Sequence, residues 1–116
     1  MKKYTINIAK EYSRTPGPRY EVEGQFSGEV FRKTIFAPII KKAIEEGCKV
    51  EINLDGTAGY GTSFIEEIFG GLIREDKLKY ADIKRQLIVI STEEEYLKED
   101  VEENLKEANE KSGYAC

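Results

Sequence analysis

The sequence predicts a single α/β domain over residues 1–116, with a mixed β-sheet of about four strands and helices packed on it. Several short segments alternate apolar and polar residues, as half-buried strands do, whereas others repeat apolar residues every three or four positions, as helices do. A helix between two apolar strands also implies a crossover connection and a parallel pair. The expected order is strand, strand, helix, strand, helix, strand, helix.

The first strand is expected in YTINIA, where Tyr4, Ile6 and Ile8 share one face. Residues 16–18, with two prolines around a glycine, predict a turn. After this turn, the alternation in RYEVEG, residues 19–24, favours a second extended segment.

A helix is expected over SGEVFRKTIFAPIIKKAIEEG, residues 27–47, because its apolar residues fall on one helical stripe. Ser27 suits the N-cap and Gly47 the left-handed C-terminal cap. Pro38 predicts a kink or a restart, since proline removes a hydrogen bond inside a helix. The later elements are a strand in CKVEINLD, a helix in SFIEEIFGGLIRED, a strand in QLIVIST and a helix in TEEEYLKEDVEENLKEAN.

Composition excludes several function classes. Histidine is absent, which removes Ser-His-Asp and Cys-His catalysis and histidine metal sites. Cys48 and Cys116 show no metal-ligand spacing, so neither a metal nor another cofactor is expected, and Cys48 suits a small buried hydrophobe. The net charge of −4, concentrated near the C-terminus, disfavours nucleic acid. With no long apolar run, the expected location is the cytoplasm, away from the membrane.

The most informative segment is the glycine-rich turn DGTAGYGTSF, residues 55–64, between a predicted strand and a predicted helix. Such turns at the carboxyl ends of strands often carry function, and glycines admit close approach by an anion. The segment lacks the lysine of GxxxxGK[ST], and Phe64 replaces the third glycine of GxGxxG. A nucleotide or small-molecule sensor, with Arg19 as an anion clamp, is therefore the alternative hypothesis. Arg19 suits a pair with a surface carboxylate equally well.

Ser63 and Glu66 form the pattern S-x-x-E, which predicts that Ser63 caps the following helix. Thr62 and Ser63 lie at the positive end of its dipole, where a phosphate is tolerated, and are candidate phosphoacceptors. The apolar residues of this helix cover about half its circumference, which leaves part of that face for a partner. On the other side, Gly70 and Gly71 either admit a neighbouring backbone or mark a loose helix end.

Three segments resemble the STAS-like domain family of bacteria: GPRY, SGEVFR and GYGTSFIEEIFGGL. Related STAS domains include antagonists of anti-sigma factors, in which a histidine-kinase-like ATPase phosphorylates a serine or threonine at the start of a helix. On this chain the resemblance places Thr62 at the phosphoacceptor, with Ser63 after it. Gly61 stands where those antagonists have aspartate, and Phe64 stands where they have the following glycine.

The leading hypothesis is a non-enzymatic regulatory domain that engages a protein partner, such as a histidine-kinase-like ATPase, in partner switching. No nucleophile–base pair can be assembled from Asp55, Glu66 and Glu67, so no catalytic residue is predicted. The identity of the partner and the oligomeric state stay open. The expected partner or ligand surface comprises Arg19, Asp55, Gly56, Gly59, Tyr60, Gly61, Glu66, Glu67, Gly70 and Gly71.

Overall fold

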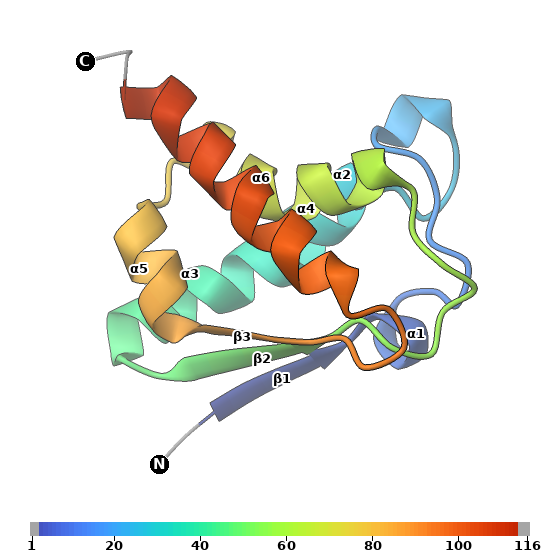
Figure 1. Ribbon diagram of the computed structural model, residues 1–116, viewed down its shortest axis with the longest axis horizontal. Coiled ribbons are helices and arrows are strands. Elements are labelled where there is room, and N and C mark those ends of the chain that lie inside the picture. The colour runs from blue at the N-terminus through green and yellow to red at the C-terminus, as the bar shows by residue number, and fades with distance from the viewer. Residues whose placement is uncertain (1–2, 114–116) are drawn as a thin grey trace.

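The computed structural model describes residues 3–113 of the chain. Three strands and a set of helices alternate along it (Figure 1). In chain order the elements are β1 (Lys3–Asn7), α1 (Ile8–Glu11), the 3₁₀-helix η1 (Glu21–Glu23), α2 (Gly28–Phe31), the π-helix η2 (Arg32–Phe36), α3 (Ala37–Glu46), β2 (Lys49–Asn53), α4 (Thr62–Arg74), α5 (Tyr80–Gln86), β3 (Leu87–Ile90) and α6 (Tyr96–Gly113).

The sheet of the described residues has three parallel strands in the order β1-β2-β3. Ile52 of the central strand pairs with Ile6 on one side and Val89 on the other. The parallel pairs confirm the crossovers expected from the sequence, but the prediction of about four strands in a mixed sheet is wrong for this part of the chain.

The predicted second strand, RYEVEG, is the source of that difference. Residues 21–23 form η1 instead, with the Glu23 amide donating to the Tyr20 carbonyl at 3.0 Å. The Tyr20 amide donates to the Glu23 carboxylate at 3.0 Å. The alternation that suggested a strand places Val22 in solvent, where no neighbouring strand pairs with it.

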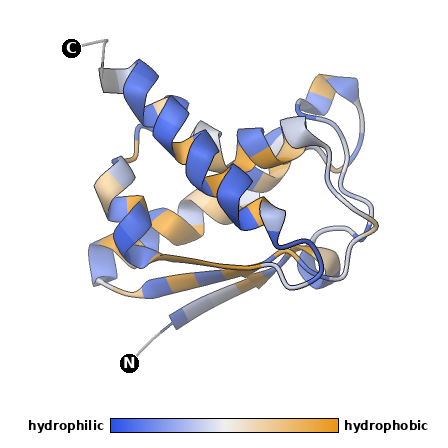
Figure 2. Cartoon of the chain, viewed as in Figure 1, coloured by the Kyte–Doolittle hydropathy of each residue, from blue (hydrophilic) through white to orange (hydrophobic). Residues whose placement is uncertain are grey.

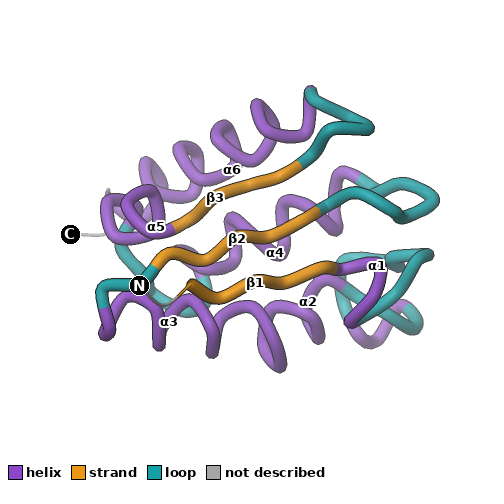
Figure 3. The backbone as a smooth tube through the Cα atoms, turned by 90° about the horizontal axis from the view of Figure 1, so that it is seen from below, coloured by secondary structure: helices purple, strands orange, loops and turns teal. Residues whose placement is uncertain are grey.

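All the large helices cover the same face of the sheet (Figure 1), and the view from below shows the strands in front of them (Figure 3). This one-sided arrangement follows from the strand order. Because β1, β2 and β3 follow one another in one direction, crossovers of the same hand place their helices on the same side. The uncovered face carries polar residues such as Thr5 and Glu51, which face each other in register.

The core lies between the sheet and the helices, and α4 runs through its centre. Inward-facing strand residues, including Ile6, Val50 and Ile52, meet Phe31, Phe36 and the apolar residues of α4. Helix α6 closes the other side of α4 with a narrow apolar stripe, Leu97, Val101, Leu105 and Ala108, on an otherwise hydrophilic helix (Figure 2).

The long helix predicted over residues 27–47 is divided into α2, η2 and α3, as its proline predicts. Ser27 caps its start, since its Oγ accepts from the Val30 amide at 3.1 Å. Pro38 lies in the first turn of α3, and the preceding five residues form a π-helical turn that ends as the Ala37 amide donates to the Arg32 carbonyl. Gly47 ends α3 in the left-handed conformation, with φ of 71°.

Two short helices carried no sequence signal that predicted them. Helix α1 begins at Ile8, so the last two residues of YTINIA are helical and not part of the predicted strand, and α5 directly precedes β3. Cys48 is partly buried against the core, close to its expected role, whereas Cys116 lies outside the described residues. No helix of residues 3–113 is long and apolar enough to cross a membrane.

Candidate functional site

The glycine-rich turn connects β2 to α4 at the carboxyl end of the sheet, as the sequence predicts. Gly56 and Gly59 adopt φ angles of 92° and 131°, which residues with a Cβ rarely adopt. A Cβ on Gly56 would also lie 3.2 Å from the Cβ of Ala9, so this glycine admits close approach by α1. The group that approaches Gly56 closely is therefore Ala9 of the same chain and not an anion.

Asp55 fastens the turn to the connection between β3 and α6. Its carboxylate accepts from the Thr92 hydroxyl at 2.6 Å, the Thr92 amide at 2.9 Å and the Glu93 amide at 3.0 Å. The hydrogen bonds from Glu93 and Thr92 hold the pKa of Asp55 below its ordinary value. The Asp55 carboxylate therefore links the glycine-rich turn to the connection between β3 and α6.

Further hydrogen bonds use the amides of the turn. The Gly56 amide donates to the Glu93 carboxylate at 2.8 Å, the Ala58 amide to the Arg14 carbonyl at 2.8 Å, and the Gly59 amide to the Thr57 hydroxyl at 3.2 Å. A phosphate cradle needs such amides unpaired and pointing at the ligand. The geometry therefore disfavours the phosphate-binding reading of this turn.

Tyr60 anchors the second half of the turn. Its hydroxyl donates to the Leu54 carbonyl at 2.7 Å, and its ring lies 5.7 Å from the ring of Phe64, centre to centre. Burial raises the pKa of Tyr60 to about 12. The Tyr60 side chain is thus neutral and partly buried, and it packs against Phe64 at the start of α4.

Helix α4 begins one residue earlier than the sequence predicts. Thr62 is its first residue, Gly61 occupies the N-cap, and no side chain of the described residues makes a capping bond there. The prediction that Ser63 caps the helix is therefore wrong. Ser63 already lies inside the first turn, and Glu66 turns away to pair with arginines instead of closing a capping box. Thr62 and Ser63 are both exposed.

A cavity of about 180 Å³ lies beside this uncapped end, between α4 and α6. Tyr60, Gly61, Thr62 and Ile65 line one side of it. The opposite side is formed by residues of α6: Tyr96, Leu97, Asp100, Glu103 and Asn104. Thr62 and the acidic residues Asp100 and Glu103 therefore line the same cavity.

The broad apolar face of α4 is buried within the domain. Its members pack on the sheet, on α2 and on α6, and all are buried: Phe64, Ile65, Ile68, Phe69, Leu72 and Ile73. Part of this face was expected to remain for a partner. The structure corrects that expectation, because α2, η2 and α6 contact this helix and all of these residues are buried.

Glu67, Gly70 and Gly71 are also buried, so these members of the expected surface lie inside the molecule. A Cβ on Gly71 would lie 2.6 Å from Nε of Arg32. A Cβ on Gly70 would overlap the carboxylate of Glu66. The glycines therefore make room for charged side chains of this chain, and neither admits a foreign backbone nor marks the end of the helix.

Those side chains form a partly buried charged network on one flank of α4. Arg32, whose side chain is 2% exposed, donates to Glu67 at 3.1 Å and to Asp76 at 2.8 Å. Arg74 donates to Glu66 at 2.7 Å and to Glu67 at 3.2 Å. Nε of Arg32 has no hydrogen-bond partner among the described residues. Arg32 is thus a buried cation held by two acids.

Arg19, in the loop between α1 and η1, also joins this network. It forms an ion pair with Glu66 and contacts Glu67 at 3.3 Å, which is the carboxylate pairing that the sequence left open. Burial would raise the pKa of Glu66, but hydrogen bonds from Arg74 and Arg19 hold it below its ordinary value. Sequence reasoning missed Arg32 and Asp76, because helical spacing alone does not show that a cation turns inward.

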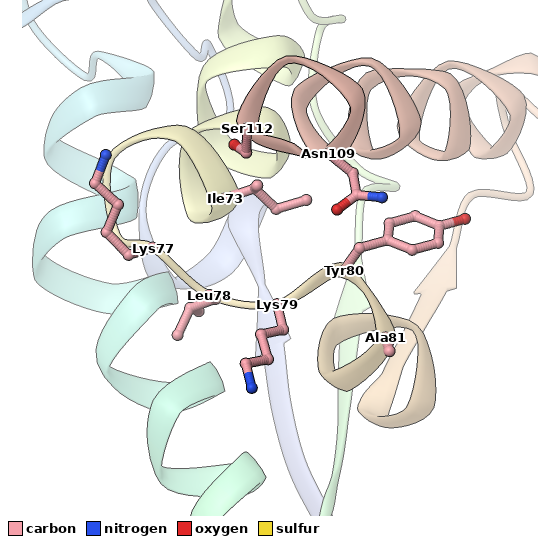
Figure 4. Close-up of a pocket in the computed structure, with 8 residues that line it drawn as sticks. All are labelled: Ile73, Lys77, Leu78, Lys79, Tyr80, Ala81, Asn109 and Ser112. Carbon is pink, nitrogen blue, oxygen red and sulfur yellow. The ribbon is translucent and has the colours of Figure 1, made fainter. Parts of the chain in front are cut away.

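A larger hollow, with a volume of about 600 Å³, lies where the link from α4 to α5 passes the C-terminal part of α6. Figure 4 shows Ile73, Asn109 and Tyr80 around its centre, whereas Lys77 and Lys79 extend away from it. No buried charge converges on this hollow. Among the described residues, no group of three potential metal ligands occurs either.

The parallel sheet, the one-sided helices and the strand-to-helix turn define a small α/β domain. A comparison with protein families matches residues 27–97 to the family described as a STAS-like domain of unknown function, and the chain belongs to this family. The resemblance read from the sequence is thereby confirmed. No curated protein and no solved structure matches the chain.

Proposed function

We propose that the chain is a non-enzymatic regulatory domain that binds a protein partner through the exposed start of α4 and the turn before it. The contact surface comprises Tyr60, Gly61, Thr62 and Ser63, bordered by Tyr96 of α6. One observation carries the proposal: two exposed hydroxyl residues lie at the uncapped end of a helix whose remaining length is mostly buried. A change there alters the surface and spares the core.

The position of Thr62 also supports a switch. A phosphoryl group on its hydroxyl would lie at the positive end of the α4 dipole, which tolerates it. The same group would share the cavity with Asp100 and Glu103, whose charges oppose it. Phosphorylation would therefore change the charge and shape of the contact surface. The family resemblance suggests a histidine-kinase-like ATPase as both kinase and partner.

The alternative of a nucleotide or small-molecule sensor has weaker support. The amides of Gly56, Ala58 and Gly59 already donate within the protein, and Arg19 is held by Glu66 and Glu67. The cavity beside Thr62 is smaller than the roughly 300–1,000 Å³ of typical small-molecule sites. The acidic residues that line this cavity also oppose an anionic ligand.

The carboxylates of Asp55, Glu66 and Glu67 are all engaged in hydrogen bonds or ion pairs, which favours a role without catalysis.

The phosphorylation part of the proposal is tested with the histidine-kinase-like ATPases encoded in the same genome. Each purified ATPase is incubated with the chain and ATP, and intact mass spectrometry follows the gain of one phosphoryl group. We expect the gain in the wild type and in Ser63→Ala, and its loss in Thr62→Ala. Phosphorylation of Thr62→Ala at the wild-type rate would contradict the assignment.

The binding part is tested with the same proteins by titration calorimetry. Thr62→Glu adds a charge at the contact surface, and Thr62→Gln is its neutral control of similar size. We expect Thr62→Glu to weaken partner binding at least tenfold and Thr62→Gln to weaken it much less, with both variants unfolding at the wild-type temperature. Equal affinity of Thr62→Glu and wild type, or no binding by any such ATPase, would refute the proposal.

A further inference from the structure

The segment from Tyr20 to Phe26, here called the η1 loop, exposes an unusual amount of apolar surface. Five large hydrophobic residues are exposed among the described residues, and three of them lie in this loop. Tyr20 and Phe26 are each 45% exposed, and Val22 is 92% exposed. In Figure 1 the loop projects from a corner of the molecule beside α2. Grouped exposed apolar residues mark interaction sites more often than single ones do.

The base of the η1 loop is held by backbone hydrogen bonds. The Gly17 amide donates to the Phe26 carbonyl, the Gly28 amide to the Pro18 carbonyl, and the Glu29 amide to the Arg19 carbonyl, each at 2.9 Å. These bonds close both ends of the loop onto each other and onto the start of α2. The exposed tip therefore has a fixed conformation.

The backbone at Phe26 is strained to keep this shape. Its φ angle is 54°, a conformation that is uncommon for a bulky residue. The ring packs edge-on against Tyr12, with centroids 5.7 Å apart and planes at 88°. Gly17 lies so close beneath that a Cβ there would overlap the carbonyl oxygen of Gln25. The fold maintains this conformation although the tip contributes little to the core.

The charged network of α4 also holds the loop. Arg19, directly before the loop, pairs with Glu66 and with the buried Glu67. The Glu21 amide within the loop donates to the Glu29 carboxylate at 2.9 Å. Arginines, backbone strain and a tight glycine therefore all preorganise one exposed apolar tip, and such preorganisation favours binding because less freedom is lost on association.

We propose that the η1 loop is a second docking surface, on which Val22 inserts into an apolar pocket of a partner protein bordered by lysine or arginine. Charge selects this occupant. Glu21 and Glu23 flank Val22 in the sequence. The same carboxylates would repel each other across a symmetric contact between two copies, and they would be repelled by anionic lipid or nucleic acid.

The test begins with photo-crosslinking in the native host. A photoreactive phenylalanine derivative replaces Val22 in the full chain, and in a control chain it replaces Ile88, an exposed aliphatic residue of the uncovered sheet face. We expect a protein crosslinked through position 22 and not through position 88, with the crosslink mapped to an apolar pocket with basic residues at its edge. Crosslinks only to a second copy or to lipid would overturn the proposal.

The captured protein is then purified, and its affinity for variants of the chain is measured. We expect Val22→Ser to weaken binding at least tenfold and Ile88→Ser to leave it unchanged, both with wild-type unfolding curves. The double variant Glu21→Lys with Glu23→Lys is expected to weaken binding as well, with a smaller dependence on salt. Equal affinity for wild type and Val22→Ser, or tighter binding by the lysine variant, would refute the proposal.

This inference is separable from the proposed function. Thr62 variants test the start of α4, and Val22 variants test the η1 loop. A chain whose phosphorylation at Thr62 fails can still bind through Val22, and the reverse also holds. If Val22→Ser abolishes binding of the captured protein and Thr62→Glu leaves binding of the ATPase unchanged, only the proposal for the start of α4 is refuted.

Discussion

The two ends of α4 differ in what their residues contact. At the N-terminal end, Thr62 and Ser63 are exposed, and no side chain within residues 3–113 caps the helix there. Toward the C-terminal end, Glu67 and Gly71 are buried, and Arg32 lies over the glycine. One helix thus separates the two tasks: its later turns hold the domain together, and its first two residues, Thr62 and Ser63, are exposed. Substitutions at the two ends should therefore have very different effects on stability.

The largest effect is expected at the buried end. Arg32→Met removes a cation that is paired with Glu67 and Asp76, and it leaves the buried Glu67 with fewer partners. Breaking a buried ion pair on one side costs about 3–5 kcal/mol. We expect a loss of this size in the free energy of unfolding, measured with urea.

The double variant Arg32→Met with Glu67→Met serves as its control, because an apolar pair of similar volume is often neutral relative to the ion pair. It should recover much of the lost stability. A loss below about 1 kcal/mol in the single variant would show that the network is weak.

A smaller difference is expected between two glycines of this region. Gly71→Ala places a Cβ against the Arg32 side chain and should cost about 1–3 kcal/mol, as overpacking does. Gly61→Ala is the comparison: a Cβ there meets nothing within 4 Å and φ is already −73°, so only the weaker N-cap preference of alanine acts, and the loss should be smaller. Thermal unfolding of both variants checks this. Equal losses would contradict the contrast between the two ends.

The smallest effect is expected at Ser63. Its hydroxyl caps nothing, so Ser63→Ala should change the free energy of unfolding by less than about 0.5 kcal/mol. Ser27→Ala, which removes a cap that accepts from the Val30 amide, should cost about 1 kcal/mol. Denaturant titration of the two variants separates them. A larger loss at Ser63 than at Ser27 would show that Ser63 caps α4 in solution.

The fold could be predicted from the sequence where local patterns and tertiary packing agree. Strong alternation located β1 and β2, and Ser27, Pro38 and Gly47 located the ends and the break of the first long helix. The η1 loop broke the agreement. Its alternation is that of a strand, but a strand must pair with a neighbouring strand. The sequence alone does not show whether such a neighbour lies close to this segment.

The site was harder to predict, because its residues take their roles from distant partners. Asp55 was expected on a contact surface but binds residues 92 and 93, 37 and 38 positions later. Ser63 and Glu66 have the spacing of a capping box, but Arg19, 47 positions before Glu66, draws the carboxylate away. Local spacing cannot reveal such competition between partners.

The order of the strands in the sheet has a consequence for how the chain folds. Because β1, β2 and β3 lie side by side in the order in which they are synthesised, each new strand adds to an existing edge and none must insert between two others. The first crossover can pack before the second is complete. Helix α6, the last element in the chain, then completes the core by packing on α4.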